Sequence, residues 1–191
     1  MIKDLVIQSR SYRKFDESVP IPAELLADLV DTARFTPASV NIQPFKYHIS
    51  TAADELAKVF SFTRWARLLK GYDGPAKGER PTGYITVLAD ISIAANPDRF
   101  RADMGIVAQT MLLAACEQGF GGCMIGNFDA EPYAEAMGFP SHLKPMLIIA
   151  LGKPAETIYL EDMPKDGQTA YYRDEQDRHH VPKRMLKDLL V

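Results

Sequence analysis

Cysteine is scarce in this sequence: only Cys116 and Cys123 carry a thiol. Two cysteines are too few for the disulfide framework of a small secreted domain. Both stand among apolar residues, where a thiol usually behaves as a small core side chain. The sequence therefore favours a reducing, cytoplasmic setting.

The sequence also has no long hydrophobic run and no excess of positive charge. Its longest apolar runs, residues 111–116 and 146–151, fall far short of the roughly 20 residues that a membrane helix needs. Lys3, Asp4 and Arg10 interrupt the N-terminal segment before the apolar core of a signal peptide could form. With 22 Lys plus Arg against 25 Asp plus Glu, the net charge is -3, so the chain lacks the basic field that holds a nucleic-acid backbone. We expect neither a membrane nor a nucleic acid as partner.

The motifs of several common active sites are missing. Residues 119–126 contain four glycines, but Met124 stands where a dinucleotide-binding turn requires the third one, and the glycines enter a strand instead of leaving it. There is no P-loop and no G-x-S-x-G nucleophile turn. His179 and His180 are adjacent and lack cysteine or carboxylate partners at metal-ligand spacing. We therefore expect no metal site.

The patterns that are present predict one domain over residues 1–191, because no repeat, linker or break in composition divides the chain. Apolar residues at helical spacing predict a helix over residues 22–34, and strict alternation predicts a half-buried strand over residues 45–51. Further predicted elements are strands at residues 84–89, 121–125 and 146–151 and a short helix at residues 129–137.

Two segments stand out from this pattern. Residues 99–118 form a long predicted helix with apolar residues around much of its circumference, so we expect it to be buried, against a second copy of the chain as one option. The polar, proline-containing residues after Gly152 are expected to be irregular except for a final element at residues 183–190. This tail is long enough to wrap around another part of the protein.

The first group of candidate site residues is Arg10, Ser11 and Arg13. Two guanidinium groups three positions apart, with a hydroxyl between them, have the chemistry of a phosphate or carboxylate clamp. Taken alone, the same residues could form a solvated basic turn.

Two further segments carry candidate residues. Residues 36–45 hold Ser39, Asn41 and Gln43 between two prolines, which makes a rigid loop able to face a planar polar ligand, or a plain connection from helix to strand. Lys183 and Arg184 end the polar tail and form either a surface charge pair or the second half of an anion clamp.

Together these segments resemble the FMN-dependent nitroreductase family. The resemblance covers the chain from end to end, because the quoted motifs occur in the order and spacing of that family. They are the segments 10–15, 37–45, 103–109, 112–115, 119–121 and 148–154. Each motif is weak by itself, and their combination is specific.

The resemblance implies where the residues of an FMN site lie. Arg10, Ser11 and Arg13 would hold the phosphate and ribityl end, with Lys183 and Arg184 closing on the phosphate from the far end of the chain. A second set would lie against the isoalloxazine ring: Pro37, Ala38, Ser39, Asn41 and Gln43. Residues Met124, Ile125 and Gly126 match the strand end that passes the opposite side of the flavin. In the family, half of each site comes from the other subunit.

The implied fold is α+β, with a mainly antiparallel central sheet flanked by helices, in an intertwined homodimer whose core would be the helix at residues 99–118. The implied activity is ping-pong transfer of hydride from NADH or NADPH through FMN to a small oxidised acceptor of the nitroaromatic, quinone or enone type. The flavin would carry the chemistry, so no catalytic side chain is expected. The alternatives are an FMN storage or sensing protein without turnover and a relative with a specialised flavin reaction.

Three departures from the family pattern affect these expectations. Ser9 stands where many members have a second basic residue, which weakens the expected clamp by one cation. Phe45 replaces a more usual Trp, a change of packing more than of chemistry. Residues 71–82 resemble a loop of one subgroup, and the sequence assigns them no role.

Overall fold

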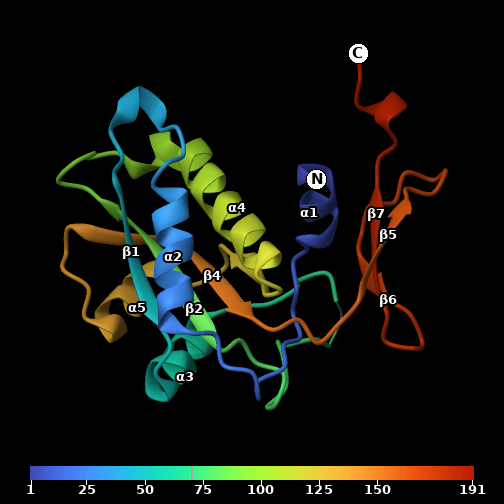
Figure 1. Ribbon diagram of the computed structural model, residues 1–191, viewed down its shortest axis with the longest axis horizontal. Helices are drawn as coiled ribbons and strands as arrows, with labels where there is room; N and C mark the ends of the chain where they lie inside the picture. The colour runs from blue at the N-terminus through green and yellow to red at the C-terminus, as the bar shows by residue number, and fades with distance from the viewer. Residues whose placement is uncertain (70) are drawn as a thin grey trace.

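The computed structural model describes residues 1–69 and 71–191 and has a four-stranded antiparallel sheet at its centre (Figure 1). The strand order is β1-β2-β4-β3, and every neighbouring pair is antiparallel. The strands are β1 (Phe45–Ser50), β2 (Gly83–Asp90), β3 (Gly121–Ile125) and β4 (Leu143–Gly152). This arrangement confirms the α+β fold with a mainly antiparallel sheet, and all four predicted strands are present.

Helices cover both faces of this sheet, so all eight residues of β2 are buried, and its apolar residues contribute to two separate clusters. On one face, α2 (Ala23–Ala33) and α4 (Arg101–Glu117) pack on Ile85 and Val87. On the other face, Tyr84 lies in the cluster that includes Val59 of α3 (Ala53–Phe62) and Tyr133 of α5 (Ala130–Met137). The central sheet is therefore packed on both faces.

The predicted helices at residues 22–34, 99–118 and 129–137 are present as α2, α4 and α5. A 3-10 turn, η2 (Pro97–Phe100), precedes α4, and the left-handed Gly138 ends α5. Our prediction missed α3, which buries only Val59 fully, so its apolar stripe is short. The opening segment forms α1 (Ile2–Gln8), which contains no buried residue.

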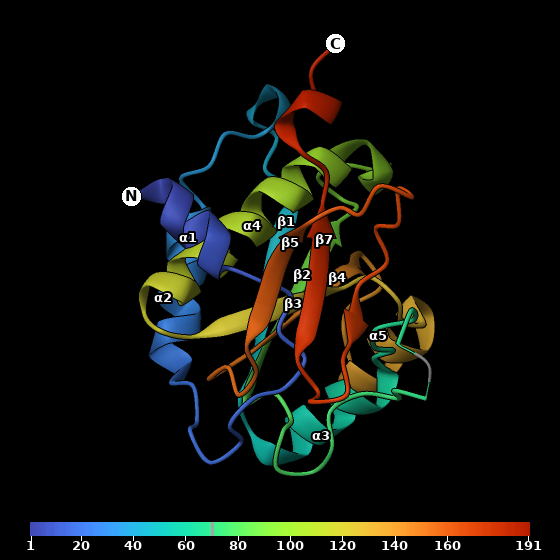
Figure 2. The same ribbon diagram turned by 90° about the vertical axis from the view of Figure 1, so that its right-hand side faces the viewer.

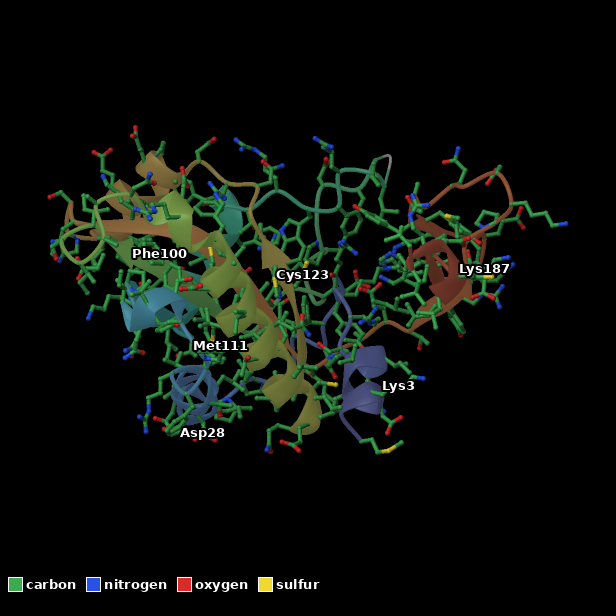
Figure 3. The ribbon with its side chains drawn as sticks, turned by 90° about the horizontal axis from the view of Figure 1, so that it is seen from above. Lys3, Asp28, Phe100, Met111, Cys123 and Lys187 are labelled. Atoms are coloured by element: carbon green, nitrogen blue, oxygen red, sulfur yellow. The ribbon has the colours of Figure 1, made fainter. Side chains whose placement is uncertain are left out.

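Only one face of α4 is buried within this chain. Val107, Met111 and Ala115 face the core, whereas Ile106 is exposed and a side-chain carbon placed on Gly105 would meet no atom. Seen from above, α1, which carries Lys3, lies between α4 and the C-terminal segment that carries Lys187 (Figure 3). Part of the apolar surface of α4 thus remains uncovered by its own chain.

The expectation of an irregular tail is wrong. Residues after Gly152 form a second sheet of order β5-β7-β6 from β5 (Ile158–Asp162), β6 (Tyr172–Arg173) and β7 (His179–Lys183). The expected element at residues 183–190 is one 3-10 turn, η3 (Leu186–Asp188). Figure 2 shows this sheet in front of the central one, and Figure 1 shows it beyond α1.

Polar contacts hold this second sheet together, which explains why an apolar pattern did not reveal it. The His180 ring stacks between Tyr159 and Tyr172, at centroid distances of 5.5 and 4.8 Å. Its two nitrogens lie 3.1 Å from a Glu161 oxygen and 3.2 Å from an Asp174 oxygen. Ring stacking and these two contacts join β5, β6 and β7.

No helix among the described residues is long and apolar enough to cross a bilayer. In the same part of the chain, no three His, Cys, Asp or Glu side chains gather closely enough to hold a metal ion.

Candidate functional site

The turn that follows α1 is anchored to the central sheet. Ser11 forms a single β-bridge with Gly122 of β3, and the Tyr12 amide donates to the Gly122 carbonyl over 3.1 Å. Phe15, fully buried, bridges to Pro154 just beyond β4. The backbone that carries Arg10, Ser11 and Arg13 is therefore held firmly against one end of the sheet.

Close packing explains the glycines that follow α4. A side-chain carbon on Gly121 would lie 2.5 Å from the Tyr12 ring, and one on Gly122 would lie 2.4 Å from the Ala150 carbonyl oxygen. These glycines let the Tyr12 turn and β4 approach β3. Their role is structural, in keeping with the failed dinucleotide pattern.

Arg10, Ser11, Arg13 and Lys183 line one cavity of about 200 Å³. Lys183 reaches it from the end of β7, so the structure brings together residues from opposite ends of the chain. The remaining wall is mainly apolar or aromatic: Ile158, Tyr171 and Val181.

The cations of this cavity have no carboxylate partner among the described residues. The Arg10 guanidinium donates to the carbonyls of Ser9 and Val6, and Arg13 donates to the Ser11 carbonyl while lying 4.7 Å from the centre of the Tyr171 ring. A neighbouring cation, Lys14, does have a carboxylate partner, because its Nζ lies 2.6 Å from an Asp177 oxygen. Cations left unpaired beside paired ones give this cavity the charge and the hydrogen-bond donors that suit an oxyanion.

Arg184 does not line this cavity. Arg184 is the residue after the end of β7, and its guanidinium donates to the Met163 sulfur over 3.6 Å. The structure thus places Lys183 at the clamp and Arg184 beside it, and a phosphate contact from Arg184 stays a prediction.

Met124, Ile125 and Gly126 line a second cavity, of about 140 Å³, that shares Arg13 and Tyr171 with the first. Ile125 is buried, so the strand end presents mainly its backbone there. A side-chain carbon on Gly126 would meet no atom within 4 Å. The two cavities therefore adjoin at Arg13.

Glu156 holds the backbone of the turn that carries Arg13. This residue was not identified from the sequence. Its carboxylate, only 4% exposed, accepts hydrogen bonds from the backbone amides of Arg13 and Lys14 and pairs with Arg173 over 2.5 Å. Burial favours its neutral form, but the nearby His179 ring, the Arg13 amide and the Arg173 charge outweigh that effect and lower the pKa of Glu156. The ionised Glu156 therefore ties the tail sheet to the Arg10–Arg13 turn.

The loop at residues 37–43 forms a separate feature. Pro37, Ala38 and Gln43 line a cavity of about 230 Å³ next to β1. Asp103, buried in the first turn of α4, accepts hydrogen bonds from the Ser39 amide over 2.8 Å and from the Ser39 hydroxyl over 2.7 Å. Because the Ser39 hydroxyl donates to Asp103, it keeps only acceptor capacity toward a ligand.

The backbone of this loop is strained. Val40, Asn41 and Gln43 all have φ near +50°, in the left-handed region that non-glycine residues rarely adopt. The Asn41 side chain accepts a hydrogen bond from Gln43 over 2.9 Å, and Val40 is almost fully exposed. Such strain commonly marks positions that contact ligands or partners.

A single chain does not bring this loop to the clamp. Figure 1 places η1 (Ser39–Asn41) at the far end of α2, with α4 between it and the turn after α1. The cavities at the two places share no lining residue. The predicted site residues thus fall into two groups, one at each place.

A comparison with protein-family models shows to which family this chain belongs. Residues 6–153 match the model described as the nitroreductase family. The chain belongs to the nitroreductase family. This is a family of oxidoreductases, and the match confirms the resemblance derived from the motifs.

Individual relatives agree with this assignment. A Methanothermobacter thermautotrophicus protein, provisionally named NADH dehydrogenase/NAD(P)H nitroreductase, is 28% identical over 158 residues, which cover 81% of this chain and 78% of the relative. The provisionally named NAD(P)H nitroreductase YodC of Bacillus subtilis is 22% identical over 183 residues, covering 82% of this chain and 91% of that protein.

Solved structures share the fold. A Staphylococcus epidermidis protein, provisionally an NAD(P)H:FMN oxidoreductase, superposes with a TM-score of 0.73 at 18% identity, over 100% of this chain and 95% of its own. A provisional nitroreductase from Exiguobacterium sibiricum, solved in complex with FMN, gives a TM-score of 0.67 at 19% identity. The superposition covers 82% of this chain and 89% of that chain.

Proposed function

We propose that the protein is an FMN-dependent oxidoreductase that transfers hydride from NADH or NADPH to a small oxidised acceptor of the nitroaromatic, quinone or enone type. The observation that supports it most is the cavity where Arg10, Arg13 and Lys183 converge without carboxylate partners among the described residues. Membership of an oxidoreductase family and the FMN-bound relative support the same cofactor.

The donor set at this cavity fits the phosphate end of FMN. A phosphate dianion is held best by several cationic donors, and guanidinium groups match its oxygens in pairs. The adjoining cavity at Met124–Gly126 offers backbone groups and an open position at Gly126, which suits the approach of a flat ring. No dinucleotide-binding turn is available for an adenosine half, which favours FMN over FAD.

Bound FMN supplies the hydride-transfer chemistry, first with the nicotinamide donor and then with the acceptor at the same place. The chain supplies binding and orientation: Arg10, Arg13 and Lys183 hold the phosphate, and Ser39 presents an acceptor suited to an N–H at the ring edge. No side chain of this protein takes part in making or breaking bonds in this proposal.

We infer that each complete site is shared by two chains, because the clamp and the loop at residues 37–43 lie apart in one chain. The uncovered apolar surfaces fit a dimer: Ile106 of α4 is 40% exposed, Ile2 of α1 is 66% exposed, and Leu189 of the tail is 60% exposed.

The expected result is a homodimer by sedimentation, and mixed dimers that regain FMN binding. Arg13→Ala damages the clamp, and Asn41→Gly removes a loop amide while tolerating the left-handed backbone. Each homodimer carries two damaged sites, whereas a mixed dimer carries one intact site and one doubly damaged site. A monomer that binds FMN tightly, or mixed dimers with no site of wild-type affinity, would contradict the shared site.

Anaerobic reduction tests the proposed activity. We expect the purified protein, reconstituted with FMN, to show both flavin absorbance bands and to bleach on addition of NADH or NADPH, with colour returning on addition of a quinone. Bound FMN that neither nicotinamide bleaches would favour a storage or sensing role. Absence of the flavin bands after reconstitution would refute the cofactor itself.

A further inference from the structure

A cavity of about 270 Å³ lies beside α3, separate from the clamp and from the loop at residues 37–43. Its walls come from the residues before α2, from α3, from the end of the loop at residues 71–82, from Thr51 just after β1 and from Tyr84 of β2. Its apolar lining includes Pro20, Leu56, Phe60 and Pro81. This cavity shares no residue with the proposed flavin site.

Two hydrogen-bond donors of this cavity have no partner among the described residues. The Tyr84 side chain is 1% exposed, and its hydroxyl is buried without a hydrogen bond. The Nε of Arg80 is also buried without an acceptor. A buried donor without an acceptor is unfavourable, so both donors are available to an acceptor that enters this cavity.

The charge state of these donors favours an anion. Burial raises the pKa of Tyr84, so its hydroxyl stays protonated and can donate. The Arg80 guanidinium lies 4.2 Å from the centre of the Phe60 ring and forms no ion pair with the described residues. Stacking on Phe60 holds the guanidinium plane in place and leaves its edge free for an acceptor.

Glu17 limits which anion fits. Its carboxylate lies on the cavity wall and accepts hydrogen bonds from the backbone amides of Gly78 and Arg80. A negative charge nearby disfavours a dianion such as phosphate more strongly than a single carboxylate, because the repulsion grows with the charge of the ligand. The apolar walls suit a ligand with an aromatic or aliphatic body.

We infer that this cavity binds a small hydrophobic monocarboxylate, with its carboxylate between Arg80 and the Tyr84 hydroxyl and its apolar body against Phe60, Leu56 and Pro81. The inference gives the loop at residues 71–82 a role that the flavin site does not provide. It is independent of the proposed oxidoreductase activity.

Hydrogen bonds anchor the loop that carries Arg80 on both sides of this residue. The Glu17 amide donates to the Gly78 carbonyl over 3.3 Å, and the Thr82 hydroxyl donates to the Val19 carbonyl over 3.1 Å. Thr82 also accepts a hydrogen bond from the Ile21 amide over 3.2 Å. Because both ends of the Arg80 segment are tied to residues 17–21, the guanidinium is held in place before a ligand arrives.

Calorimetric titration with benzoate tests this inference, with the protein saturated with FMN so that the clamp is filled. We expect saturable binding that leaves the flavin spectrum unchanged, and much weaker binding of benzamide and inorganic phosphate. Arg80→Gln is expected to lower the benzoate affinity by tenfold or more, because one charge-assisted hydrogen bond contributes about that factor. Tyr84→Phe, which keeps the ring, is expected to lower it about threefold to tenfold.

Lys77→Gln is the matched control, because it removes an exposed cation from the same loop without touching the cavity. Benzoate affinity should be unchanged in this variant. Equal benzoate affinity in the wild type and in a folded Arg80→Gln protein would overturn the inference. The absence of saturable heat at tens of millimolar benzoate would also overturn it, because it would mean that only water fills the cavity. If Arg80→Gln fails to fold, the Tyr84→Phe titration decides.

Discussion

Replacing Arg13 by alanine is expected to lower the affinity for FMN by about tenfold to a hundredfold and to leave the affinity for riboflavin nearly unchanged. Arg13 lines the clamp cavity with no carboxylate partner in the described chain, so its charge is available to a phosphate. A charge-assisted hydrogen bond of this kind contributes roughly 1.5–3 kcal/mol. Riboflavin keeps the ring and lacks the phosphate, so it does not use this interaction.

Two further variants are expected to weaken FMN binding to different extents. Fluorescence titration of the apoprotein measures the FMN and riboflavin affinities of all three variants. Lys183→Ala should weaken FMN binding about tenfold, because Lys183 reaches the same cavity. Arg184→Ala should have a smaller effect, because its guanidinium contacts the Met163 sulfur. Equal losses for FMN and riboflavin in Arg13→Ala and Lys183→Ala would show that these residues act through the fold and form no phosphate clamp.

The central sheet could be predicted from the sequence because its signals are local and apolar. β2 is buried on both faces and carries the strand-forming run Tyr84–Val87, and the sequence of β1 alternates apolar with polar residues. For α2, the buried residues Leu26, Leu29 and Ala33 repeat at helical spacing. In these elements, burial of apolar area selects the structure, and hydrophobic periodicity records that burial.

The tail sheet could not be predicted in this way, because its contacts are polar and its partners are distant. Arg173 of β6 pairs with Glu156 over 2.5 Å, and Asp177, between β6 and β7, pairs with Lys14. Contacts between such distant residues leave no periodic trace in the sequence. The small sheet therefore resembled an irregular terminus, although residues 179–183 carry the clamp lysine.

The sequence predicted only part of the arrangement of the candidate site residues. The motif residues Arg10, Ser11, Arg13 and Lys183 meet at one cavity, as the resemblance implied. Glu156 and Tyr171 escaped notice, because a single acid or tyrosine in a polar tail has no distinguishing pattern. The donation of the Ser39 hydroxyl to Asp103 was equally invisible, since 64 positions separate these residues in the chain.

Glu156→Gln is expected to lower the free energy of unfolding at neutral pH by about 3 kcal/mol, the lower part of the range for breaking a buried ion pair. The variant leaves Arg173 with Asp177 as its remaining partner, at 3.2 Å, which moderates the loss. Glu175→Gln makes the same chemical change at an exposed position of the tail and should alter stability by less than about 0.5 kcal/mol. Urea unfolding of the three proteins measures both differences.

The pH dependence of this loss distinguishes the charge of Glu156 from the shape of its side chain. The folded protein lowers the pKa of Glu156, so the unfolded chain takes up the proton first as the pH falls. The stabilisation by the ionised Glu156 is therefore complete above the ordinary pKa of glutamate. It disappears as the pH falls through the lowered pKa of the folded protein. The difference in unfolding free energy between wild type and Glu156→Gln should therefore shrink steadily below about pH 4.5. A difference that stays constant from neutral pH to pH 3 would mean that the amide disrupts packing, and that the ionised carboxylate does not hold the tail sheet to the Arg10–Arg13 turn.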